Sequence, residues 1–363
     1  MITFDHVSKR FPDGTVAVED LTLEVPSGEV VVLVGPSGSG KTTIMRMVNR
    51  MIPPTRGRVL IDGQDVAERD PARLRRGIGY VIQQIGLFPH RTVVENIGTV
   101  PELEGWDRPR IAERSLELMA TVGLPDNMAD RYPHQLSGGQ RQRVGVARAL
   151  AADPNIMLMD EPFGAVHPIV RTRLQDEFLR LQREVRKTII FVTHDIDEAI
   201  KMGDRIAILS HGGKLEQYSP PRELLSDPAN DFVAEFLGEE RGLKRLALIP
   251  VSEVSAEPGP VVRPDDTAER AQEVARAHGT DWVVVVADSG HLEGWVSLHE
   301  LEPGQAVGDA KVRPFALMVR ATDSLRAALN AMVTNRTGVA VRVSGDDRYE
   351  GLLTQEIVSK EIR

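Results

Sequence analysis

Short, uninterrupted apolar runs are the first regularity along this chain. They occur at residues 30–34, 156–159 and 188–193, and contain only apolar or β-branched side chains. Runs of this length are typical of strands, and strands without polar alternation are typical of a parallel sheet covered on both faces. We therefore predict an α/β fold with a parallel central sheet. Because the carboxyl ends of parallel strands meet at one edge, polar residues that end these runs should lie together there.

Other segments have alternating or helical patterns. Further strands are predicted at residues 3–7, 16–23, 59–66, 78–83, 205–209 and 214–216. Helices are predicted at residues 43–51, 141–152 and 219–237. Residues 92–130 have a helical pattern in which Pro101, Pro109 and the turn at 123–125 are expected to make breaks.

The last third of the chain repeats itself. The pattern Glu293-Gly294-Trp295-Val296-Ser297 returns as Glu350-Gly351-Leu352-Leu353-Thr354, a shift of 57 residues without a gap. Each copy has the pattern strand, helix, strand, turn, strand, helix. A period of this length marks a repeated supersecondary unit that buries its apolar face against its copy. We predict a first domain at residues 1–237, a linker at 238–243, and copies at 244–303 and 307–363.

Composition limits the class of protein. A length of 363 residues favours two or three domains, and the net charge of −9 disfavours a nucleic-acid binder. The chain has no cysteine, which excludes disulfides and thiolate metal sites. No apolar run approaches the roughly 20 residues of a membrane helix, and no signal segment opens the chain. Attachment to a membrane would therefore require a partner.

A glycine-rich stretch after the first apolar run carries the strongest chemical signal. It reads Gly35-Pro36-Ser37-Gly38-Ser39-Gly40-Lys41-Thr42 and is followed by Thr43 and a predicted helix. Strand, glycine-rich turn and helix form the context of a phosphate-binding loop, in which backbone N–H groups and the helix N-terminus hold phosphates. Lys41 can reach the β- and γ-phosphates, and the Thr42 hydroxyl can hold Mg²⁺.

Polar residues end three other predicted strands. Asp160 and Glu161 follow the run at 156–159, where Asp160 would hold Mg²⁺ and Glu161 would polarise the attacking water. His194 follows the run at 188–193 and could hydrogen-bond to the γ-phosphate, although a lone histidine there is more often structural. Gln83 can coordinate Mg²⁺ or orient a water, or can simply be solvated.

Two further features suit a nucleotide site. Phe11 could stack on an adenine ring, although core packing is the better interpretation of this residue by itself. The run Leu136-Ser137-Gly138-Gly139-Gln140 opens a predicted helix with Ser137 as N-cap, and its glycines leave N–H groups open to an anion. An ordinary helix cap does not need such a specific run.

Together these motifs resemble an ATP-binding-cassette (ABC) ATPase subunit over residues 1 to about 237. The resemblance implies a P-loop NTPase cassette with a RecA-like core, an antiparallel β subdomain and a helical subdomain. It implies ATP at residues 35–43 with adenine on Phe11, and catalytic roles for Gln83, Glu161 and His194. It also implies a head-to-tail homodimer, in which residues 136–140 of one subunit complete the ATP site of the other. ATP binding would close the dimer, and hydrolysis would reopen it.

One position departs from the family pattern. The D-loop is usually a small residue, Ala, Leu and Asp, whereas here it is Gly164-Ala165-Val166-His167. In the family that Asp helps the two ATP sites communicate. A neutral histidine can still hydrogen-bond, but its charge and reach differ. We therefore expect reduced or pH-sensitive coupling between the sites.

The segment from Tyr80 to His90 resembles ATP-binding subunits of bacterial importers for glycine betaine, carnitine, choline or proline betaine. In that family the region near Gln83, with Glu95 and Asn96, receives a cytoplasmic coupling helix from the membrane subunit. The implied assembly is a homodimer with two integral-membrane permease subunits, and an extracytoplasmic solute-binding protein reaches it through the permease. The implied location is peripheral, at the cytoplasmic face of the cell (inner) membrane.

The repeated tail resembles an α+β tandem of cystathionine-β-synthase-type (CBS) domains, whose general role is regulation by nucleotides, dinucleotides or ionic strength. The family's nucleotide-binding copy has Ser or Thr followed three residues later by Asp. Those slots hold Ser297 and Glu300 in the first copy, whereas Ile357 in the second cannot accept a ribose hydroxyl. At most one adenosine-type site is expected. An aromatic box of Trp282 and Trp295 for a quaternary ammonium is conceivable, but both lie on predicted strands, which favours core packing.

The sequence thus predicts the ATP-hydrolysing subunit of an importer for a quaternary amine, with ATP and Mg²⁺ as cofactors and the tail as a regulatory sensor. An importer for another small solute, or a soluble non-transport ABC regulatory ATPase, are the alternatives.

Overall fold

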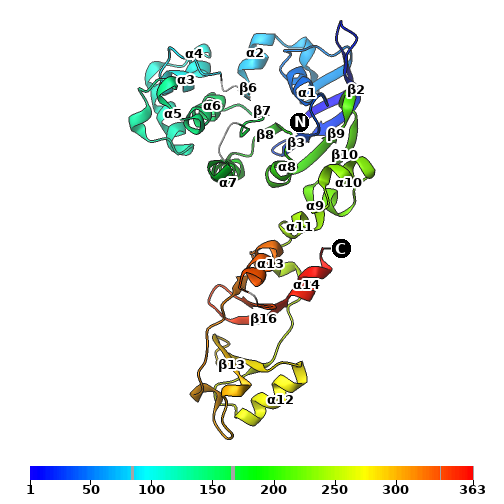
Figure 1. The fold of residues 1–363 in the computed structure, drawn as a ribbon. Coiled ribbons are helices and arrows are strands. Elements are labelled where there is room, and N and C mark those ends of the chain that lie inside the picture. Colours follow the sequence, from blue (N-terminus) through cyan, green and yellow to red (C-terminus); the bar gives the residue numbers. More distant parts are fainter. Residues whose placement is uncertain (83–85, 165–167, 336, 363) are drawn as a thin grey trace. The chain divides into compact units, whose positions relative to one another are not determined.

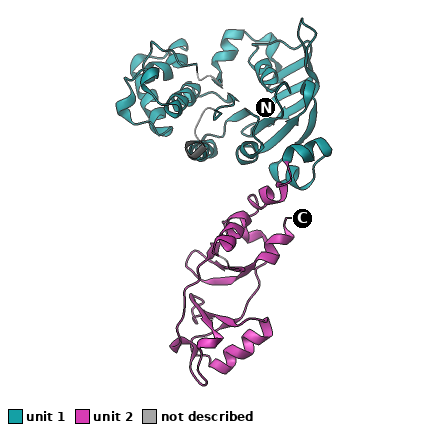
Figure 2. Ribbon diagram, viewed as in Figure 1, with its two compact units in different colours: residues 1–237 teal, residues 238–363 magenta. Residues whose placement is uncertain are grey.

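A computed structural model of the chain describes residues 1–82, 86–164, 168–335 and 337–362, without the side chains of 168–170. The chain divides into two compact units, Met1–Leu237 and Gly238–Arg363 (Figures 1 and 2). Each unit has its own sheets and its own apolar core. The two units are therefore described separately.

The centre of the first unit is a six-stranded sheet with strand order β10-β9-β3-β8-β7-β6. Its strands are β3 (Val30–Val34), β6 (Ile78–Val81), β7 (Ile156–Asp160), β8 (Thr188–Thr193), β9 (Arg205–Leu209) and β10 (Leu215–Ser219). All neighbours are parallel except β9 and β10. Every residue of β3, β7 and β8 is buried, as their uninterrupted apolar pattern predicts.

A second, four-stranded antiparallel sheet packs on the first through a shared apolar core. Its strands are β1 (Ile2–Arg10), β2 (Val16–Val25), β4 (Arg56–Ile61) and β5 (Gln64–Asp65). Helix α1 (Lys41–Val48) contributes Ile44, Met45 and Val48 to this core, so the helix that follows the glycine-rich loop is fixed between the two sheets.

The helical lobe contains α3 (Val93–Ile97), α4 (Thr99–Leu103), α5 (Arg108–Thr121) and α6 (Gly138–Leu150) (Figure 1). The break expected at Pro101 lies at Gly98, between α3 and α4, and Pro101 is in the first turn of α4, where a missing N–H leaves no hydrogen bond unmade. Pro109 likewise lies in the first turn of a helix, α5. The other helices of the unit are α2 (Pro71–Arg76), α7 (Pro168–Val185), α8 (Ile196–Met202), α9 (Pro221–Ser226) and α10 (Asp231–Leu237).

The second unit contains two three-stranded sheets, one from each copy of the repeat. The first copy has β11 (Val261–Val262), α12 (Ala268–His278), β12 (Trp282–Val286) and β13 (Leu292–Ser297). The second has β14 (Met318–Arg320), α13 (Leu325–Thr334), β15 (Val339–Val343), β16 (Tyr349–Thr354) and α14 (Gln355–Lys360), and α11 (Arg241–Leu246) precedes both copies. The predicted final helix of the first copy is only a 3₁₀ turn, Leu298–Glu300, because Pro303 and Gly304 follow closely.

The two copies exchange the segments that lead into them. Arg313, which leads into the second copy, forms an antiparallel bridge with Trp295 of β13 in the first copy. Glu257, which leads into the first copy, bridges in the same way to Leu352 of β16 in the second. Apolar side chains of the two leading segments are exchanged as well. Val251, before the first copy, packs in the core of the second copy, and Val307 packs in the core of the first. Neither copy is therefore complete without residues that precede the other.

Candidate functional site

The loop between β3 and α1 has a conformation that requires glycine. Gly40 has a φ of 78°, and a Cβ atom there would lie 2.2 Å from the carbonyl oxygen of Ala17. Helix α1 begins at the next residue, Lys41. The amino end of the helix therefore adjoins the loop, where its partial positive charge favours an anion.

The Lys41 side chain lies along this loop. Its Nζ donates hydrogen bonds to the carbonyl oxygens of Gly35 and Pro36, both at 2.8 Å, and to Ser39 Oγ at 3.2 Å. Lys41 is 7% exposed, and burial lowers the pKa of its ammonium group. All three acceptors are neutral, so a phosphate would give this buried cation a stronger, charged partner.

Thr42 and Asp160 meet beside the loop. Thr42 Oγ1 donates a hydrogen bond to Asp160 Oδ1 at 3.2 Å. Asp160 is 4% exposed at the end of β7, and burial raises the pKa of its carboxyl group. A hydroxyl and a carboxylate are oxygen ligands of the kind that Mg²⁺ prefers. No cluster of three or more His, Asp or Glu side chains that could hold a metal occurs among the described residues.

Glu161 and His194 form the second polar pair at this edge. Glu161 follows β7 with a φ of 44°, and its N–H donates to the carbonyl oxygen of Val192 in β8 at 2.9 Å. Its Oε1 lies 3.2 Å from Nδ1 of His194, which follows β8. The Glu161 side chain is 22% exposed and that of His194 is 63% exposed. A sheltered carboxylate and an accessible imidazole thus lie on the same edge as the loop after β3.

The remaining residues predicted to bind ATP surround the loop. Ser39 is buried, Pro36 and Thr43 are half-buried, and Ser37 and Gly38 are exposed. Phe11 follows β1, is half-buried against the core, and has Lys9 Nζ 5.3 Å from its ring centroid. Both interpretations of Phe11 are therefore accommodated, since part of its ring packs in the core and part is accessible.

The run 136–140 lies in the helical lobe, at the start of α6. Leu136 is buried, and Ser137 is the N-cap: its Oγ accepts from the N–H of Gln140 at 3.3 Å, and its own N–H donates to Gln140 Oε1 at 2.8 Å. This capping box fixes the first turn, which contains Gly138 and Gly139. Figure 1 shows α6 apart from α1 within the same unit. No hydrogen bond between residues 136–140 and the loop is found in the described part of the chain.

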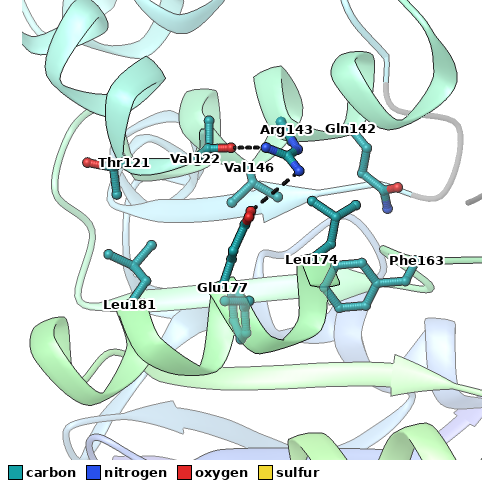
Figure 3. A pocket seen from close by; sticks show the side chains of 10 residues that line it. Thr121, Val122, Gln142, Arg143, Val146, Phe163, Leu174, Glu177 and Leu181 are labelled. Carbon is teal, nitrogen blue, oxygen red and sulfur yellow. Dashed lines mark hydrogen bonds and ion pairs between the residues drawn. The ribbon is translucent and has the colours of Figure 1, made fainter. Parts of the chain in front are cut away.

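Arg143 joins the helix α6 to two other helices (Figure 3). Its Nη1 donates to the carbonyl oxygens of Val122 and Gly123, both at 2.9 Å, just beyond the carboxyl end of α5. Its Nη2 lies 3.5 Å from Glu177 Oε2 of α7, and the two side chains are 15% and 27% exposed. Arg143 belongs to the polar run that follows residues 136–140, but the sequence does not indicate its partner Glu177.

Three predicted functional residues lie outside the described residues. They are Gln83 and the D-loop positions Ala165 and His167. Their roles remain predictions from the sequence.

The tail residues singled out in the sequence lie close to one another. Ser297 ends β13, and Glu300 in the following 3₁₀ turn forms an ion pair with Arg313. The Glu300 carboxylate, which the nucleotide hypothesis assigns to a ribose hydroxyl, is therefore already paired with Arg313. Trp282 and Trp295 are only half-buried, and both line one cavity.

Comparisons with known proteins identify the families of both units. The ABC transporter family matches residues 18–164, and the CBS domain family matches residues 251–301 and 307–363. The dimeric structure of the bacterial ABC transporter cassette MJ0796 is 35% identical, with a TM-score of 0.56, and covers 61% of this chain and 99% of its own. A post-hydrolysis dimer of that cassette, bound to ADP and Pi, is 34% identical and has a TM-score of 0.56. The match covers 61% of this chain and 99% of its own.

The fold and the site therefore define an ABC transporter ATPase with a CBS pair. The osmoprotectant import ATP-binding protein OsmV of Salmonella typhimurium is 43% identical over 99% of this chain and 95% of its own length. The glycine betaine/carnitine/choline transport ATP-binding protein OpuCA of Bacillus subtilis is 48% identical over 83% of this chain and 80% of its own. The chain belongs to this family of import ATP-binding proteins, whose members bind and hydrolyse ATP. In the described part of the chain, no helix has the length and apolar character required to cross a bilayer.

Proposed function

We propose that this chain is the ATPase subunit of an importer for a quaternary amine osmoprotectant, such as glycine betaine, carnitine, choline or proline betaine. The observation that carries the proposal is one sheet edge that gathers the phosphate-binding loop, Asp160, Glu161 and His194 in a chain whose relatives are named for these solutes. A non-transport regulatory ATPase is not favoured by those relatives.

ATP would bind with its phosphates on the loop after β3. Lys41 would transfer its hydrogen bonds from the loop carbonyls to phosphate oxygens, and Phe11 would support the adenine ring. Mg²⁺ would be held by Thr42, Asp160 and Gln83, and when bound it neutralises charge on the phosphates. Glu161 would accept the proton of the attacking water, and His194 would orient Glu161 and contact the γ-phosphate.

The site also requires a second copy of the chain. The capped amino end of α6 presents Ser137 and the N–H groups of Gly138 and Gly139, a suitable arrangement for phosphate oxygens. No hydrogen bond links these groups to the loop of their own chain in the described residues. We propose that they complete the partner's ATP site in a head-to-tail homodimer, so that ATP binding closes the dimer.

The permease would dock on the helical lobe. A groove of about 750 Å³ lies between α3 and α5, and Glu95, Glu102, Trp106 and Ile111 are among its lining residues. Asn96, in contrast, is fully buried and donates hydrogen bonds to the carbonyls of Phe88, Arg91 and Thr92. Glu95 would therefore contact a coupling helix directly, whereas Asn96 would shape the loop beside it. Two permeases, reached from outside by a solute-binding protein, would hold the dimer at the cytoplasmic face of the membrane.

Uptake by the complete complex tests the proposal. The chain would be co-expressed with its permeases, reconstituted into vesicles and supplied with ATP on the side of the ATPase. The solute-binding protein and labelled glycine betaine, carnitine, choline or proline betaine would be added on the opposite side. Uptake of at least one amine should require ATP and disappear with Glu161→Gln. Failure of the chain to co-purify with any permease, or uptake of none of these amines by an active complex, would overturn it.

A further inference from the structure

The tail contains a cavity of about 390 Å³, within the size range of small-molecule sites. Trp282 and Trp295 from the first copy line it, together with Phe315 and Arg313 from the segment that leads into the second copy. The wall is completed by Thr337, Gly338 and Val339. The exchange of segments between the copies therefore brings three aromatic rings and one cation together.

One ring of this cavity already faces a cation. The guanidinium of Arg313 lies 5.3 Å from the centroid of the Trp295 ring. The two residues are held in register, because the N–H of each donates to the carbonyl oxygen of the other at 2.8 and 2.9 Å. Trp282 and Phe315 form an edge-to-face pair, with centroids 6.2 Å apart and planes at 76°. Cations bind to such ring faces, and quaternary ammonium ions are typical ligands of aromatic cages.

The charged groups beside the rings are balanced. Arg313 pairs with Glu300, and their side chains are 40% and 33% exposed. A zwitterion matches this pair, since its carboxylate can replace Glu300 at Arg313 while its ammonium group takes the ring face and the vicinity of Glu300. A nucleotide carries several negative charges, and here it would meet one arginine and one carboxylate. The charge of this site therefore matches a zwitterion better than a nucleotide.

The strands of the repeat form in the other copy with different residues at these positions. The positions displaced by 57 residues from Trp282, Trp295, Glu300, Arg313 and Phe315 hold Val339, Leu352, Ile357, Ala256 and Pro258. The equivalent positions on the other side of the pair, on β15 and β16 and in the segment that leads into the first copy, thus keep the same strand pairing without any of these aromatic or charged groups. The aromatic and ionic set belongs to one side of the pair only.

We propose that this cavity binds a quaternary ammonium zwitterion, so that the tail senses the accumulated solute directly. That the bound amine is also the imported one rests on the proposed function. The ammonium group lies against Trp282, Trp295 and Phe315, and the carboxylate pairs with Arg313. The sequence prediction of core packing holds in part for Trp282, which packs against the apolar cluster between the two copies. Each tryptophan is nevertheless only half-buried and lines the cavity.

Titration of the full-length chain tests the site. The chain has three tryptophans, of which Trp106 lies in the helical lobe, so Trp106→Phe leaves tryptophan fluorescence, excited selectively over that of tyrosine, from the tail alone. Glycine betaine and carnitine should change that fluorescence and give saturable heat in calorimetry, whereas glycine, which lacks the methylated ammonium, should not. Trp295→Leu and Trp282→Val, which install the residues of the second copy, should each weaken binding by at least about tenfold.

The outcomes separate this proposal from the proposed function. Saturable betaine binding that is lost in Trp295→Leu, while the circular dichroism and ATPase rate stay unchanged, supports the cavity whether or not vesicles import betaine. Absence of betaine binding up to tens of millimolar, or binding unaffected by both tryptophan substitutions, overturns it even if import is demonstrated. Displacement of betaine by AMP at micromolar concentration in a Lys41→Ala chain would also overturn it, since the cavity would then be a nucleotide site.

Discussion

The hydroxyl of Thr42 donates a hydrogen bond to the carboxylate of Asp160 across 3.2 Å, although 118 residues separate them in the chain. The contact joins the first turn of α1 to the end of β7, two elements on the carboxyl edge of one sheet. Asp160 is 4% exposed, so its charge is held in a poorly solvated place, and burial raises the pKa of its carboxyl group. A buried carboxyl group beside a hydroxyl at the edge of the sheet is a candidate for a cation ligand.

Asp160→Asn should therefore stabilise the nucleotide-free protein at pH 7 and lower ATPase activity by at least about 100-fold. Because the folded-state pKa is raised, the destabilising carboxylate is present above that pKa and is relieved as the pH falls through it. The difference in Tm between mutant and wild type should then shrink toward pH 4. Thermal melts without Mg²⁺ from pH 4 to 8 would measure it, with the exposed Asp130→Asn as the control. A lower Tm for Asp160→Asn at pH 7 would contradict the prediction.

Glu161→Gln should slow turnover by about 10²–10⁴-fold, because it removes the base beside His194 and leaves the loop contacts of Lys41 intact. ATP affinity should change less than about twofold. The closed dimer should accumulate with ATP and be visible by size-exclusion chromatography. Glu184→Gln, at an exposed position on α7, is the matched control. Turnover at the wild-type rate would remove Glu161 from the catalytic role.

We expect the contact between Arg143 and Glu177 to hold the helical lobe in the position in which it completes the ATP site of the partner subunit. Arg143→Ala leaves two carbonyl oxygens near the end of α5 without their donor and should destabilise the lobe by about 1–3 kcal/mol. We expect a several-fold loss of ATPase rate and a lower Hill coefficient for ATP, with ATP binding to the monomer unchanged. Arg180→Ala removes a 3.9 Å pair to Glu184 on the exposed side of α7 and should change stability by less than about 0.5 kcal/mol. Equal effects of the two substitutions would contradict a specific role for Arg143.

His167→Asp restores the residue usual for the family at the D-loop. A histidine changes charge near pH 6.5, so cooperativity between the two ATP sites should vary between pH 6 and 8 in the wild type and be higher and flatter in the variant. ATPase assays over ATP concentration at pH 6, 7 and 8 would measure it. Identical rates and Hill coefficients for both chains would rule out this role of the D-loop position.

Many features of the site could be predicted because they are local in the chain. The glycine spacing of residues 35–42 specifies a loop before a helix, and Asp160 and His194 are located by the ends of apolar strands in a parallel sheet. Boundaries were predicted less well. A break was expected at Pro101, and it lies at Gly98, between α3 and α4, with Pro101 in the first turn of α4. The first copy of the repeat lacks the final helix that its pattern suggested.

The sequence by itself determined the class of protein, the phosphate-binding loop and the repeat, since each depends on residues within one element or on a fixed period. Only the tertiary structure decided which distant residues touch: Glu177 with Arg143, and Phe315 and Arg313 with the two tryptophans of the tail. The physical reason is that hydrogen-bond periodicity and turn geometry are set by neighbours in the chain. Contacts between elements arise instead from the packing of buried faces. For the exchanged segments of the tail, no pattern of neighbouring residues indicates which strand they will contact.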